Sequence, residues 1–261
     1  MIGAIAGDII GSVYEAWPIK TKDFPLFHPQ GRFTDDSVLT VAIADAILGG
    51  RPYEDAVREF GRRHPDAGYG GRFISWLFAA APRPYHSWGN GAAMRVSPVG
   101  FAFDTERDVL AEAAKTAAFT HDHPEGIKGA QATALAVFLA RTGHDKEAIR
   151  ALIAERFDYD LERSVEDIRP GYGFDVSCQG TVPEAIIAFL DSDSFEDAVR
   201  NAVSLGGDSD TLACIAGGMA EAFYGGVPDT IRDTVLSLLT PDLRVVVEAF
   251  QARFGRHERG R

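Results

Sequence analysis

The chain has 261 residues, of which 46% are hydrophobic and 25% are charged, and its formal net charge is −12. This length and composition allow a sizeable hydrophobic core and are ordinary for a soluble globular protein. The negative charge argues against a broad basic surface for binding a nucleic-acid backbone, although bound cations could still recruit a small anionic ligand.

Helical patterns follow one another along the chain. Apolar residues at helical spacing predict helices over residues 37–48, 53–63, 70–80, 125–141, 145–156, 211–224, 228–239 and 241–254. Capping patterns of the type Ser/Thr-x-x-acid predict three further helices that begin near Thr105, Thr181 and Ser194. Pro183 then falls in a first helical turn, where proline is tolerated. Since no alternating run of β-branched residues predicts a strand, the sequence predicts an all-α fold.

Nothing in the composition divides the chain. Residues 1–254 are predicted as a single domain, followed by a frayed basic tail over 255–261. The two cysteines, Cys178 and Cys214, are too few for a disulfide framework or a zinc site, which indicates a reducing compartment. Because neither a signal peptide nor an apolar run of roughly 18 residues is found, we expect a cytoplasmic protein that does not bind membranes.

Two short acidic clusters are the strongest functional signal. Thr34–Ser37 reads Thr-Asp-Asp-Ser, Asp208–Thr211 reads Asp-Ser-Asp-Thr, and each precedes an apolar helical run. Asp and Ser are favoured helix N-caps, which accounts for either cluster alone. A cap needs one acceptor, however, whereas each cluster carries two carboxylates that repel each other unless a cation is present. If the clusters meet in the fold, their oxygens suit two hard cations such as Mg²⁺ or Mn²⁺.

Two glycine-containing segments offer further candidate contacts. Glu15 ends a small-residue segment over 7–15, for which no helix is predicted. It is either a solvated surface carboxylate or a group aimed at a metal-bound water or a leaving group. Asp66–Gly71 precedes a helical run, and its glycines would let backbone N–H groups approach a phosphate, although such turns are common.

Two further loops carry aromatic and basic side chains. Trp88, within Ser87–Arg95, either stacks on a base or anchors the loop. Arg95 either pairs with an acid or is solvated. His121 and His123 precede a helix, and too few soft ligands accompany them for a zinc site. A polar helix entry or a ligand contact through His121 is therefore expected.

Taken in order, four motifs resemble those of the ADP-ribosylglycohydrolase family. They are Gly7-Asp8-x-x-Gly11-Ser12-x-x-Glu15, Thr34–Ser37, Gly89–Arg95 and Gly206–Thr211. Each motif alone is weak, but the ordered set, which extends from about residue 3 to residue 225, is specific. The resemblance implies a compact, orthogonal multi-helix bundle with a binuclear Mg²⁺ or Mn²⁺ centre.

The resemblance also implies the residues of the site. Glu15 and Asp36 would take part in catalysis, with Glu15 near the scissile bond. The metal ligands would be Thr34, Asp35, Asp36, Asp208, Asp210 and Thr211. ADP-ribose would be bound by Gly68, Tyr69, Gly70, Gly71, Ser87, Trp88, Asn90, Gly91 and His121.

The activity that the resemblance implies is metal-dependent hydrolysis of the glycosidic bond between ADP-ribose and an acceptor, with release of ADP-ribose. ADP-ribosylated arginine is the first expected substrate, and a serine-linked or small-molecule conjugate is the next. The expected partner is thus an ADP-ribosylated protein or small molecule. Two other interpretations remain open: a catalytically silent ADP-ribose-binding or structural protein on the same fold, and a binuclear-metal phosphohydrolase that releases AMP.

Overall fold

The computed structural model describes residues 1–255, and within them every regular element is a helix. In chain order the helices are α1 (Ile2–Ala16), α2 (Asp35–Gly49), α3 (Tyr53–Arg63), α4 (Gly71–Phe78), α5 (Gly91–Met94), α6 (Ser97–Ala102), α7 (Glu106–Ala118), α8 (Pro124–Arg141), α9 (Lys146–Phe157), α10 (Val165–Ile168), α11 (Cys178–Leu190), α12 (Phe195–Ser204), α13 (Ser209–Tyr224), α14 (Asp229–Leu238) and α15 (Pro241–Phe254). The prediction of an all-α fold is confirmed. Beyond Gly255, the predicted tail lies outside the described residues.

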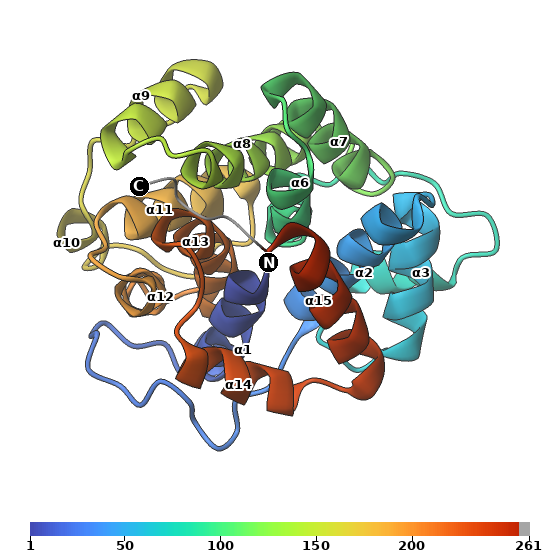
Figure 1. Cartoon of the computed structure of the whole chain (residues 1–261), viewed down its shortest axis with the longest axis horizontal. Helices are drawn as coiled ribbons and strands as arrows, with labels where there is room; N and C mark the ends of the chain where they lie inside the picture. The colour runs from blue at the N-terminus through green and yellow to red at the C-terminus, as the bar shows by residue number, and fades with distance from the viewer. Residues whose placement is uncertain (256–261) are drawn as a thin grey trace.

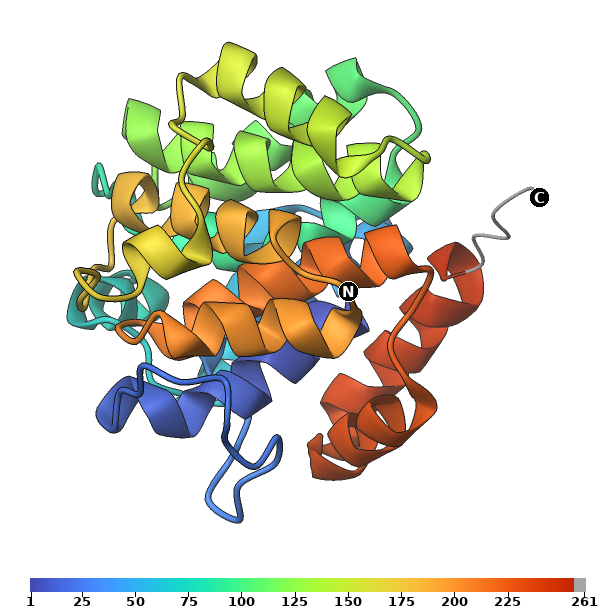
Figure 2. The same cartoon turned by 90° about the vertical axis from the view of Figure 1, so that its left-hand side faces the viewer.

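Helix α1, which the sequence patterns did not predict, lies near the centre of the molecule beside α13 (Figures 1 and 2). Three glycines four residues apart, Gly3, Gly7 and Gly11, face α13. A Cβ atom built on Gly7 would lie 1.9 Å from the carbonyl oxygen of Ala213, and one on Gly11 would lie 2.4 Å from that of Ser209. The antiparallel helices are therefore closer than larger side chains would allow, and the end of α1 meets the start of α13.

The other helices cover this central pair. Helices α7, α8 and α9 lie together at the top of the molecule, and α14 lies at the bottom (Figure 1). Buried apolar side chains form a continuous core that extends from Met1 to Phe250 in α15. Within residues 1–255, no helix combines the length and the apolar character needed to cross a membrane.

The start of α11 differs from the prediction. The helix begins at Cys178 because the side chain of Ser177 caps it, accepting a hydrogen bond from a first-turn N–H group at 3.1 Å. The hydroxyl of Thr181, the predicted cap, instead donates to the carbonyl oxygen of Asp175 at 3.0 Å. Pro183 consequently lies inside the helix rather than in its first turn.

Most other helix starts agree with the sequence patterns. The side chains of Thr105 and Ser194 cap α7 and α12 as predicted, and Thr34 caps α2. Asp208 occupies the N-cap position of α13, so each acidic cluster does lie at a helix N-terminus. The short helices α5, α6 and α10 were not predicted, because four to six residues are too few to show helical periodicity.

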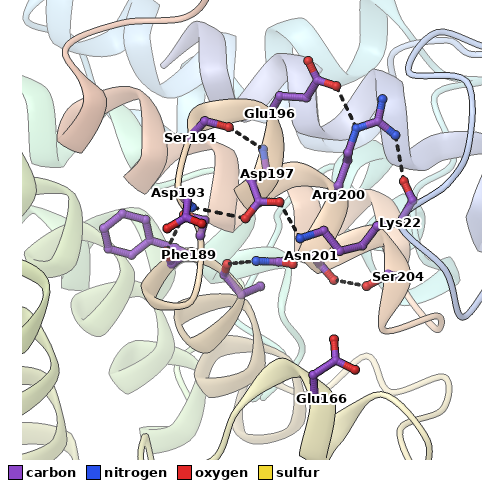
Figure 3. A network of polar contacts seen from close by, with 12 residues as sticks. Lys22, Glu166, Phe189, Asp193, Ser194, Glu196, Asp197, Arg200, Asn201 and Ser204 are labelled. Carbon is purple, nitrogen blue, oxygen red and sulfur yellow. Dashed lines mark hydrogen bonds and ion pairs between the residues drawn. The ribbon is translucent and has the colours of Figure 1, made fainter.

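The long connection between α1 and α2 is fastened to α12 by charged side chains (Figure 3). Nη1 of Arg200 donates to the carbonyl oxygens of Lys22 and Phe24, at 2.9 and 2.8 Å, and its guanidinium lies over the Phe24 ring. Lys22 in turn forms an ion pair with Asp197. The fastening matters for the site, since this connection joins two helices that carry candidate site residues.

Candidate metal centre and ligand cavity

A cavity of about 500 Å³ brings most of the sequence-predicted residues together. The predicted residues that line it are Glu15, Thr34, Asp35, Asp36, Gly68, Gly70, Gly71, Ser87, Asn90, Gly91, His121, Asp208, Asp210 and Thr211. Two predicted residues do not belong to the lining. Tyr69 is buried, and Trp88 is 48% exposed with its ring edge-on to His123.

The first acidic cluster is held in place by Asp8, a fully buried residue of α1. Its carboxylate accepts hydrogen bonds from the N–H group and the hydroxyl of Thr34, at 2.9 and 2.7 Å, and from the N–H group of Ser37 at 3.0 Å. Burial raises the pKa of Asp8 to about 6, although these hydrogen bonds oppose the shift. Asp8 thus attaches the N-terminus of α2 to α1. Its place in the first family-like motif was the only sequence signal for this role.

The second acidic cluster reaches the same place from α13. Carboxylate oxygens of Glu15, Asp208 and Asp210 lie within 4.8 Å of one another. The hydroxyl of Thr211 donates to Oδ1 of Asp36 at 3.3 Å, which joins the two clusters directly. Residues from opposite ends of the chain therefore meet, as the metal interpretation requires.

The electrostatics of these carboxylates suit a bound cation. Burial, reinforced by neighbouring acids, raises the pKa of Asp36 and Asp210 well above the usual range and that of Asp35 to about 8. Oδ2 of Asp36 is buried without a hydrogen-bond partner among the described residues. A buried, unpartnered carboxylate oxygen among other acids fits a hard divalent cation, which would supply the missing positive charge.

A turn beside this acidic cluster is suited to an anion. Gly68 has a φ of +107°, a conformation that favours glycine, and a Cβ atom there would lie 3.6 Å from Oδ1 of Asp35. The turn leads into Gly71, the first residue of α4. Arg72 also lines the cavity, with its guanidinium 5.0 Å from the centroid of the Tyr85 ring. Helix N-termini and arginine side chains both favour negatively charged groups.

Asn90 and His121 form another wall of the cavity. Nδ2 of Asn90 donates to Oδ2 of Asp208 at 2.6 Å and to the hydroxyl of Thr181 at 3.1 Å. A Cβ atom on Gly91 would lie 3.1 Å from Nε2 of His121, so glycine leaves room for the imidazole. The loop of the third family-like motif therefore contacts both the acidic cluster and the histidine.

Several lining residues were not predicted, because their residue types are ordinary and only the fold places them here. They are Ser12, Arg32, Leu39, Ala67, Arg72, Phe73, Tyr85, Gly89, Met94, Arg95 and Val176. Neither sequence interpretation of Arg95 is correct. Its side chain is fully buried, and it donates to the carbonyl oxygen of Thr116 and the hydroxyl of Thr120 instead of pairing with an acid or with water.

The fold and the cavity define an all-helical protein with paired acidic clusters beside a glycine-rich turn that leads into the N-terminus of α4. A family model described as ADP-ribosylglycohydrolase matches residues 1–259, and the chain belongs to this family. This confirms the family resemblance and the predicted enzyme class, an ADP-ribosylglycohydrolase.

Similarity to several relatives and to a solved structure covers most of the chain. ADP-ribosylhydrolase ARH3 from Mus musculus and from Homo sapiens are each 26% identical, over 86% of this chain and 82% and 84% of their own lengths. ADP-ribosylarginine hydrolase Tri1 from Pseudomonas putida is 26% identical, over 87% of this chain and 71% of its own length. A structure described as an ADP-ribosylglycohydrolase-related protein complex is 27% identical, with a TM-score of 0.74 over 98% of this chain and 96% of that chain.

Proposed function

We propose that the protein hydrolyses the glycosidic bond between ADP-ribose and an acceptor with the help of two divalent cations, Mg²⁺ or Mn²⁺. The observation that carries this proposal is the meeting of two acidic clusters at one cavity, through the hydrogen bond from Thr211 to Asp36. The unpartnered Oδ2 of Asp36 and the close carboxylates of Glu15, Asp208 and Asp210 support it.

The residues proposed to hold the cations all offer hard oxygen atoms, and they are Thr34, Asp35, Asp36, Asp208, Asp210 and Thr211. When bound, the cations would supply positive charge that orients ribose hydroxyls and lowers the pKa of a water molecule. Asp36, one of these proposed ligands, is also proposed to take part in catalysis. The turn at Gly68–Gly71, with Arg72, would bind the diphosphate, and Asn90 and His121 would bind the remainder of ADP-ribose.

Glu15 is the proposed acid or base. Unlike Asp208 and Asp210, which are buried, its side chain is exposed to solvent at the cavity, where an acceptor can approach. Burial of part of the side chain and the charges of Asp208 and Asp8 raise its pKa. A carboxylate with a raised pKa can hold a proton for a leaving group and later accept one from water.

The acceptor is proposed to be arginine, because the Pseudomonas putida relative is named an ADP-ribosylarginine hydrolase. The ARH3 relatives, however, match over a larger share of their own lengths, and their name specifies no acceptor. A serine-linked or small-molecule conjugate is therefore the second candidate. Because both cysteines are buried and unpaired, we also propose a reducing, cytoplasmic location.

The test is to incubate the protein with arginine-, serine- and phosphate-linked ADP-ribose conjugates and to identify the products by mass. We expect free ADP-ribose with Mg²⁺ or Mn²⁺, and none after a chelator has removed the metal. Full activity in metal-free protein would contradict the metal-dependent mechanism. Release of AMP would indicate a phosphohydrolase, and binding of ADP-ribose without turnover would indicate a silent binding protein.

A further inference from the structure

We propose that Arg95, acting through Thr120, determines which ring nitrogen of His121 carries the proton. The geometry points to a neutral imidazole with its proton on Nε2, which presents an N–H donor to the cavity. Arg95 and Thr120 are then positioning residues for a ligand contact. The inference rests on the proposed function in one respect, since it takes ADP-ribose as the ligand.

The hydrogen bond between Arg95 and Thr120 has only one possible direction. Arg95 is fully buried, and its Nη2 lies 2.7 Å from the carbonyl oxygen of Thr116 and 2.8 Å from Oγ1 of Thr120. Its guanidinium also lies 4.9 Å from the centroid of the Phe119 ring. Because a guanidinium has donors and no acceptor, the Thr120 oxygen must accept this hydrogen bond.

The hydroxyl proton of Thr120 points to the neighbouring ring of His121. Oγ1 of Thr120 lies 2.8 Å from Nδ1 of His121, and both residues are buried. If Nδ1 carried the ring proton, the Thr120 oxygen would accept one hydrogen bond from Arg95 and another from His121. The hydroxyl proton of Thr120 would then have no acceptor. An unpaired buried donor is costly. The hydroxyl therefore donates to Nδ1, and the neutral ring must carry its proton on Nε2.

The surroundings of the His121 ring keep it neutral and leave space beside Nε2. Burial, together with the positive charges of Arg95 and Arg72, lowers the pKa of His121 well below its usual range, so the ring stays neutral. A Cβ atom on Gly91 would lie 3.1 Å from Nε2, and one on Gly89 would lie 3.5 Å away. The two glycines leave space around Nε2, for which no hydrogen-bond partner is found among the described residues, and His121 lines the cavity.

The tautomer is tested by two-bond ¹H–¹⁵N NMR of the histidine rings in the metal-loaded protein, with His121→Gln to assign the signal. Thr120→Val removes the hydroxyl with little change in shape, and Thr120→Ser restores it. Thr133→Val is the matched control, because Thr133 is a buried threonine whose hydroxyl has no hydrogen-bond partner among the described residues. Calorimetry with ADP-ribose and steady-state kinetics are run on each variant.

We expect only the Nε2–H pattern in the wild type, Thr120→Ser and Thr133→Val, and a mixture of the Nε2–H and Nδ1–H patterns in Thr120→Val, where the ring is no longer held in one tautomer. The same variant should bind ADP-ribose about tenfold more weakly, the upper range for one net hydrogen bond. Its KM should rise while kcat stays nearly unchanged, because a contact made equally in ground and transition states is lost. A general loss of structure would instead lower kcat as well.

An Nδ1–H pattern in the wild type would overturn the inference. So would a Thr120→Val spectrum with the Nε2–H pattern alone, because the hydroxyl would then not determine the tautomer. If Thr120→Val does not fold, the wild-type and Thr120→Ser spectra decide the tautomer, and their affinities must agree. Failure of wild-type protein to bind ADP-ribose would contradict the proposed function instead, while the spectra would still decide the tautomer.

Discussion

Glu15 and Asp208 lie close together but differ in exposure, and this separates their expected roles. Glu15→Gln keeps the shape of the exposed side chain, so metal content and ADP-ribose binding should be retained. Turnover should fall at least about 10²-fold, the low end for a lost general acid or base. Asp208→Asn removes the charge of a buried ligand, so metal occupancy and turnover should fall together.

Metal analysis and ADP-ribose calorimetry on both variants distinguish the two roles. Glu15 is also close enough to Asp208 and Asp210 to share a cation with them. In that case Glu15→Gln would lose metal as Asp208→Asn does. Near-normal turnover of Glu15→Gln would exclude the proposed proton transfer.

A second prediction at the residue scale concerns the aromatic partner of the adenine base. Tyr85 lines the cavity beside Arg72 and His121, whereas Trp88 does not belong to the lining. Tyr85→Ala should weaken ADP-ribose binding by about 1–3 kcal/mol, the range for stacking of a base on an aromatic ring. Trp88→Ala, made in parallel, should cost less, and calorimetry measures both. A larger loss at Trp88 would support the sequence-based assignment.

At the scale of helices, the close approach of α1 and α13 positions the two acidic clusters. Gly7→Ala places a methyl group where its carbon would lie 1.9 Å from the carbonyl oxygen of Ala213, so the helices must move apart. We expect a loss of about 1–3 kcal/mol in the free energy of unfolding, as for other overpacked cores. Metal affinity should also fall, because Asp8 and Glu15 move away from Asp210.

Gly49→Ala is the control for this experiment. Gly49 is also helical, but a Cβ atom there would meet no atom closer than 3.9 Å. Alanine in a helix is favoured over glycine, so this variant should be as stable as the wild type or slightly more stable. Urea denaturation and metal titration are the measurements. Equal effects of the two substitutions would show that close packing of α1 on α13 is unimportant.

For the whole molecule, the carboxylate cluster predicts how the metal-free protein responds to pH. The pKa of Asp35 is raised by burial and by neighbouring acids to about 8, above the unfolded value of about 4. The folded state therefore binds this proton more tightly. The resulting stabilisation is complete below about pH 4 and is lost as pH rises towards 8.

Asp35→Asn removes this dependence. In the presence of a chelator, the variant should match the wild type near pH 4 and be more stable at pH 8. The difference at pH 8 should be at least about 1 kcal/mol, a lower bound set below the roughly 1.4 kcal/mol that a pKa shift of one unit represents. With Mg²⁺ or Mn²⁺ the order should reverse, because the wild type keeps the ligand charge and bound metal stabilises the folded state. Urea denaturation across pH is the measurement. A difference that does not change with pH would contradict the electrostatic account.

How much the sequence could predict depends on how local each feature is. Thr34 and Asp208 could be placed at helix N-termini because caps and apolar periodicity involve residues within a few positions of each other. Helix α1 was missed because its glycines resemble a loop, although they face the backbone of α13. Trp88 was assigned to the ligand from the family resemblance of its loop, and a loop motif carries no information about the direction of the side chain.

The sequence by itself determined the helical class, the two acidic clusters and the type of chemistry that their oxygens allow. Only the tertiary structure decided that the clusters meet, that Asp8 attaches one of them to α1, and that Arg95 reaches His121 through Thr120. The physical reason is distance along the chain. Capping and periodicity act between near neighbours, whereas the meeting of the two clusters depends on how closely α1 and α13 pack, and that closeness is set by the glycines on their shared face.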